Sequence, residues 1–197
     1  MRKKVKTALS FGENVMDKIE ELLKNPQTDL QKQALTDTSY KNIDHGLSDD
    51  DTNFELATYG DAILKLALCK IYREYKENGL KFSENLSDWK KKYESDKVLV
   101  QVIAQHYKLL NFLGFDRDDK KKPNDYKYND ENEGSGEGKA KDEEHISEGT
   151  KRRYKYIATA MEACIAAVYI ENGENEVIEI VKQWIGWIDK VTNSSDT

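Results

Sequence analysis

Apolar side chains recur at the spacing of amphipathic helices along most of this 197-residue chain. The first stripe, Val15, Ile19, Leu22 and Leu23, stops before Asn25-Pro26, which is typical of a helix end. Similar stripes predict helices over residues 56–75, 86–93, 98–113, 154–170 and 176–191. No run of residues alternates as a strand would. The pattern therefore predicts an all-α fold.

Residues 116–149 break this pattern. The run from Glu133 to Gly138 alternates Gly with Glu and Ser, and almost nothing aliphatic appears in the stretch before Ile146. Such a segment cannot bury enough apolar area to offset the entropy lost on ordering, so we expect a mobile, low-complexity insertion. The sequence thus predicts a single domain over residues 15–191 with this insertion at about 116–149. Tails of residues 1–14 and 192–197 flank the domain.

The charge balance is acidic, with 31 Lys and Arg against 37 Asp and Glu and a formal net charge of -6. This argues against a protein that coats nucleic acid nonspecifically, but allows a local basic face or a carboxylate site for metal ions. No apolar run approaches the roughly 18 residues that cross a bilayer, so no membrane is expected as a partner. Because the start Met1-Arg2-Lys3-Lys4 is not followed by the apolar region of a signal peptide, the sequence predicts a cytoplasmic location.

Four segments carry a more specific pattern. They are Ala34 to Asn42 (ALTDTSYKN), Asn53 to Ala62 (NFELATYGDA), Leu86 to Phe115 (ending LGF) and Ala158 to Ile170 (ATAMEACIAAVYI). In this order, and on helices of these lengths, they resemble the catalytic domain of ribonuclease III. That family is an all-helical homodimer that cuts double-stranded RNA with divalent metal ions held by carboxylates on helices. The resemblance implies a ribonuclease III-type helical domain over about residues 15–190, apart from the insertion.

The resemblance carries over only part of the family's carboxylate cluster. Asp61 and Glu162 match two of its acids and are the implied catalytic residues. Ala57 stands where the family has a glutamate, Thr159 where it has an aspartate, and Phe54 replaces another acidic position. Carboxylates three or four residues apart on a helix share one face, so this loss removes neighbours of both retained acids.

A simple magnitude shows what this loss means for metal binding. Two divalent ions about 4 Å apart repel by about 16 kcal/mol at an effective dielectric constant near 20. Four carboxylates could offset most of this repulsion, whereas two could not. We therefore expect Asp61 and Glu162 to hold a single Mg²⁺ or Mn²⁺, with the Thr159 hydroxyl as a neutral ligand.

Two basic runs are candidates for contact with RNA phosphates. They are Lys90-Lys91-Lys92 and Lys151-Arg152-Arg153. Solvated helix faces and loop flanks explain the same runs equally well. The resemblance also implies that the aliphatic face from Ile63 to Ala67 forms the seam of a homodimer.

The leading hypothesis is a dimeric ribonuclease III-type domain that binds double-stranded or structured RNA and hydrolyses it with Mg²⁺. Ala57 and Thr159 favour an alternative, a non-catalytic RNA-binding or ribonucleoprotein scaffold that kept the fold but lost the full metal site. A third alternative is a protein–protein module with no role in RNA binding.

Overall fold

The computed structural model describes residues 17–80, 82, 84–114 and 148–194, and this part of the chain is helical, with no strand. The all-α prediction is confirmed. The elements are α1 (Lys18–Lys24), α2 (Asp29–Ala34), η1 (Thr38–Asn42), η2 (Asp49–Asp51), α3 (Phe54–Glu77), α4 (Leu86–Glu94), α5 (Asp96–Val98), η3 (Leu99–Ala104), α6 (Gln105–Tyr107), η4 (Leu109–Asn111), α7 (Glu148–Asn172) and α8 (Glu174–Ser194). Within the described residues, none of the helices is both long and apolar enough to cross a bilayer.

The observed bounds differ from the predicted ones at several places. The helix predicted over residues 98–113 is a series of short pieces that includes the π-helical turn η3. Among these pieces, α6 ends at Tyr107, and the backbone of the next residue, Lys108, is left-handed at φ 54°. Helix α8 continues to Ser194, so residues 192–194 are helical rather than part of a tail. Residues 1–14 and most of the predicted insertion, up to 147, lie outside the described residues.

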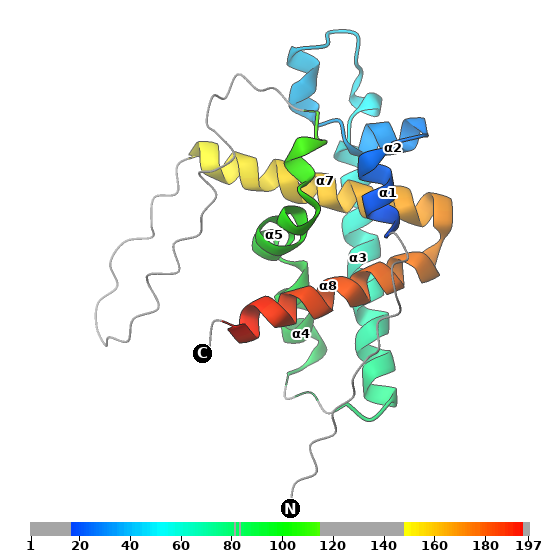
Figure 1. Cartoon of the computed structure of the whole chain (residues 1–197), viewed down its shortest axis with the longest axis vertical. Helices are drawn as coiled ribbons and strands as arrows, with labels where there is room; N and C mark the ends of the chain where they lie inside the picture. The colour runs from blue at the N-terminus through cyan, green and yellow to red at the C-terminus, as the bar shows by residue number, and fades with distance from the viewer. Residues whose placement is uncertain (1–16, 81, 83, 115–147, 195–197) are drawn as a thin grey trace, which may run out of the picture.

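Helices α7 and α8 form an antiparallel hairpin that α3 crosses (Figure 1). The turn between them is a single residue, Gly173, whose φ of 86° suits glycine and disfavours any side chain. Its N–H donates to the Tyr169 carbonyl at 2.9 Å, which closes the end of α7.

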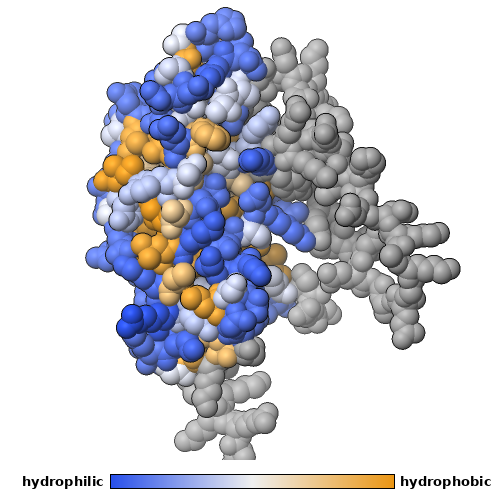
Figure 2. Space-filling view, turned by 180° about the vertical axis from the view of Figure 1, so that it is seen from behind, coloured by the Kyte–Doolittle hydropathy of each residue, from blue (hydrophilic) through white to orange (hydrophobic). Residues whose placement is uncertain are grey.

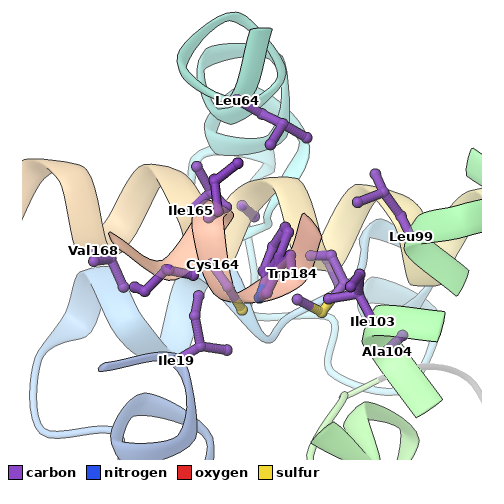
Figure 3. Close-up of a cluster of buried hydrophobic side chains, with 14 of the residues drawn as sticks. Ile19, Leu64, Leu99, Ile103, Ala104, Cys164, Ile165, Val168 and Trp184 are labelled. Carbon is purple, nitrogen blue, oxygen red and sulfur yellow. The ribbon is translucent and has the colours of Figure 1, made fainter. Parts of the chain in front are cut away.

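Helix α7 is the centre of the core. From Ile157 to Val168 every residue is buried except Thr159 and Glu162. A helix that is apolar on nearly all sides must be surrounded by other elements. Figure 3 shows these elements: Leu64 of α3, Leu99 of η3, Trp184 of α8 and Ile19 of α1 all point toward α7. Thr159 and Glu162 are therefore the only partly exposed polar residues in this otherwise buried and apolar part of α7.

The aliphatic face predicted to form the dimer seam is part of the same core. Ile63, Leu64 and Ala67 are buried inside this chain, so the prediction that these three residues face a second copy is wrong, whereas Leu66 of the same run is exposed. The outer face of α3 exposes Leu66 together with Tyr59, which lies outside the predicted run, and each is 47% accessible. Figure 2 views the molecule from behind, the side on which α3 lies, and shows apolar patches separated by hydrophilic surface.

Candidate functional site

Helices α3 and α7 are in close backbone contact at Gly60. A Cβ at this position would lie 1.8 Å from the carbonyl oxygen of Glu162 and 2.5 Å from its carbonyl carbon. No side chain fits at that distance from backbone atoms, so the crossing requires glycine here. The next residue on α3 is Asp61. The Gly-Asp-Ala motif therefore sets one of the two predicted acids beside the helix that carries the other.

Glu162 lies within the electrostatic influence of the other predicted acid, Asp61. Burial among the core helices is the main cause that raises the pKa of Glu162 to about 7. The negative charges of Asp61 and Asp96 raise the pKa further, while Lys65 and Lys155 lower it. Two acids predicted from distant segments thus share one electrostatic environment.

Asp96 is an addition that sequence reasoning missed. It is the first residue of α5, where Ser95 caps the helix by accepting a hydrogen bond from Val98. An acid at this position is common, because the N-terminal end of a helix favours negative charge. Nothing local in the sequence therefore marked Asp96 as a neighbour of Glu162.

Lys65 lies among these acids. Its Nζ donates to Oδ2 of Asp61 at 2.6 Å, one helical turn away on α3, and both side chains are partly exposed. This hydrogen bond is the main cause that raises the pKa of Lys65, and the charges of Asp61, Glu94 and Glu162 add to it. The spacing of four residues between Asp61 and Lys65 was visible in the sequence and could have signalled this pair.

The residues at the crossing do not fit a pair of divalent ions. Ala57, one turn before Asp61, is buried in the core and offers no ligand atom. Thr159 contributes a neutral hydroxyl at most, and one oxygen of Asp61 is engaged by Lys65. Across the described parts of the chain, no three His, Cys, Asp or Glu side chains converge closely enough to hold a metal ion.

Each lysine of the first predicted RNA-binding run lies within ion-pair distance of an acid. The pairs are Lys90 with Glu94 at 3.2 Å, Lys91 with Asp88 at 3.9 Å and Lys92 with Asp189 at 2.7 Å. The pair with Asp189 joins α4 to α8, so Lys92 has a structural role. Their contact with RNA stays a prediction.

The second run, Lys151, Arg152 and Arg153, falls in the first turns of α7, and its side chains lie outside the described residues.

Comparison with known proteins decides the family. Residues 55–173, more than half of the chain, match the model of the ribonuclease III domain. The chain belongs to the ribonuclease III family. The nuclease domain of ribonuclease III from Campylobacter jejuni has the same fold, with a TM-score of 0.55 and 19% sequence identity. The likeness covers 90% of this chain and 95% of that one. No curated protein matches the chain.

The ribonuclease III domain matched here includes both retained acids. It extends from Glu55, at the start of α3, to Gly173, the turn after α7, and so contains Asp61 and Glu162. The family consists of RNA-processing nucleases, whose members generally use divalent metals. This ribonuclease III domain keeps the helix crossing of that fold, but Lys65 pairs with one of the two acids.

Proposed function

We propose that this ribonuclease III domain binds double-stranded or structured RNA as a non-catalytic scaffold. Family membership supports RNA as the partner. The observation that supports the absence of hydrolysis is the Lys65–Asp61 ion pair at the α3–α7 crossing. A carboxylate that already pairs with an ammonium group is a poor ligand for Mg²⁺, which prefers oxygen ligands in near-ideal octahedral geometry.

The lysines at the crossing also supply positive charge that RNA requires. Lys65 of α3 is partly exposed, and Lys155, one turn before Thr159 on α7, is exposed. Both act electrostatically on Glu162, so they border the same place. Lysines contact phosphates as point charges and need no metal ion to bridge them. We infer that these two side chains help to bind the RNA backbone.

A duplex RNA titration tests this function. Fluorescence anisotropy would be recorded with EDTA and with Mg²⁺, over a series of salt concentrations. We expect equal affinity in both buffers, a steep fall in affinity with salt, and no cleavage of the duplex. Lys155→Met should reduce the slope of log affinity against log salt by about one. Lys24→Met, which removes an exposed lysine paired with Glu20 on α1, is the control.

Two results would contradict the proposal. Absence of RNA binding at low salt would favour the protein–protein module instead. Cleavage of the duplex that requires Mg²⁺ or Mn²⁺ would favour metal-dependent hydrolysis, provided that Asp61→Asn and Glu162→Gln abolish it.

Metal-dependent hydrolysis is the second candidate function, with Mg²⁺ or Mn²⁺ as the ion. Asp96 favours this candidate, because the negative charges of Asp96 and Asp61 both raise the pKa of Glu162. This concentration of negative charge on three helices is what a cation would neutralise. The candidate requires that the ion displace Lys65 from Asp61.

We also propose that the domain forms a homodimer, as its family generally does. The exposed apolar residues on the outer face of α3, Tyr59 and Leu66, support this. Tyr59 contacts Tyr169 of α7 with the ring centroids 6.0 Å apart, and the next residue, Ile170, is 52% accessible. The exposed apolar surface thus extends from α3 onto α7, as a seam between two copies would require.

A further inference from the structure

We propose that the ammonium group of Lys65 takes the place of a divalent cation in this ribonuclease III domain. Negative charge at the crossing is then partly neutralised from within the chain, and this side chain lowers the affinity of Asp61 for a metal ion, in addition to the missing acids at Ala57 and Thr159. The inference concerns the same site as the proposed function and rests on it for the view that the site serves RNA binding.

The position of Lys65 supports the inference. Its Nζ lies 2.6 Å from Asp61, and its charge interacts with those of Glu94 and Glu162. These three acids come from α3, α4 and α7. Lys65 thus places its positive charge in contact with one acid and close enough to two others to interact with their charges, where a cation would otherwise be attracted.

Other ion pairs on α3 do not share this arrangement. Arg73 pairs with Glu77 at the same four-residue spacing, but Glu77 supplies the only charge that shifts its pKa among the described residues. Lys70 pairs with Glu174 of α8 at 2.5 Å. Lys65 therefore differs from the Arg73–Glu77 pair on the same helix, because acids beyond its immediate partner act on it.

The charges around Lys65 are nearly balanced. The acids that interact in this region are Asp61, Glu94, Asp96 and Glu162, and the lysines are Lys65, Lys90 and Lys155. With all of these ionised, the acids carry four negative charges and the lysines three positive ones. A divalent ion entering beside Lys65 would be repelled by it, whereas the same ion would be attracted once Lys65 is neutral.

Manganese binding tests the inference directly. Binding of Mn²⁺ to the full chain would be measured by electron paramagnetic resonance for the wild type and for Lys65→Met. We expect Lys65→Met to bind Mn²⁺ about tenfold more tightly or better, because a unit charge about 4 Å from a divalent ion repels it even at the dielectric constant of water. Lys65→Arg keeps the charge and should bind no more tightly than the wild type.

Lys70→Met is the matched control. Lys70 lies on the same helix with similar exposure and an equally close acidic partner, so its replacement should leave Mn²⁺ affinity unchanged. Equal affinity of Lys65→Met and the wild type would overturn the inference, as would an equal gain in Lys70→Met. Lys65→Gln provides a second neutral variant if the methionine variant does not fold, with circular dichroism as the test of folding.

The same variants separate this inference from the proposed function. Duplex RNA binding in EDTA would be measured beside the Mn²⁺ titration. If the wild type does not bind duplex RNA, RNA binding is refuted as the function. A gain of Mn²⁺ affinity in Lys65→Met would still support the proposal that Lys65 takes the place of a cation. RNA binding with no such gain would leave the function in place and refute the role of Lys65.

Discussion

Replacing Glu162 by glutamine should stabilise the protein, but only where the carboxyl is ionised. The pKa of Glu162 is raised from 4.5 to about 7, first by burial and then by the charges of Asp61 and Asp96. A carboxyl with a higher pKa in the folded than in the unfolded protein holds its proton more tightly when folded. The free energy of unfolding therefore falls as the pH rises from about 4.5 through about 7, and this loss is complete above that range.

The magnitude follows from the same two pKa values. The difference, 7 minus 4.5, corresponds to about 3 kcal/mol at 1.36 kcal/mol for each pKa unit. Because Glu162 is partly exposed, solvent screening reduces this, and we take about 1.5 kcal/mol as the expected gain. For a domain of this size such a gain raises Tm by about 3 to 6 °C.

The assay is urea unfolding of the wild type and Glu162→Gln in EDTA at pH 8 and at pH 4.5. We expect the variant to be more stable by about 1.5 kcal/mol at pH 8 and equal within about 0.5 kcal/mol at pH 4.5. Glu179→Gln, at an exposed glutamate of α8, controls for general effects of the substitution. An equal difference at both pH values, or a less stable variant at pH 8, would refute this account of Glu162.

Two further predictions concern α3. Gly60→Ala should destabilise the domain by about 3 kcal/mol or more, since its Cβ would meet the α7 backbone at 1.8 Å. Thermal unfolding measures this loss of stability. The control is Gly46→Ala, whose Cβ would meet only the side chain of Asp44 at 3.2 Å and which should be nearly neutral. Equal losses of stability in both variants would contradict the close contact of α3 and α7. Leu66→Glu should convert a dimer into a monomer in analytical ultracentrifugation, whereas Leu80→Glu, at a similarly exposed leucine after α3, should not. A dimer that survives Leu66→Glu would exclude this face as the seam.

Periodicity alone predicted the long helices, because their apolar positions are numerous enough to define one packed face. It failed for residues 98–113, where the left-handed backbone at Lys108 and the π-helical turn η3 divide the predicted helix. Element η3 packs against α7, a contact that the local pattern of residues 98–113 does not encode. Local pattern was therefore a poor guide where tertiary packing decides the backbone.

The candidate site was predictable only in part. Motif resemblance predicted Asp61 and Glu162, and the structure places them in one electrostatic environment. Asp96 and Glu94 were missed because their proximity depends on how α4 and α5 pack, which no spacing along the chain encodes. Lys65 was missed for a different reason: its pairing with Asp61 is local, but Asp–Lys pairs four residues apart are common on helix surfaces and do not by themselves mark a site.

The packing of Ala57 determines what an additional carboxylate at this position of α3 would cost. A glutamate there would place a charged carboxylate within the apolar core, at a cost of several kcal/mol without a compensating cation. An aspartate in place of Thr159 would add negative charge next to Glu162. Each change alone should cost stability, while a site with four carboxylates would need both changes and the release of Asp61 from Lys65. For the proposed non-catalytic scaffold, single substitutions would therefore not readily build a four-carboxylate site, because each added acid is unfavourable without the other and without a cation.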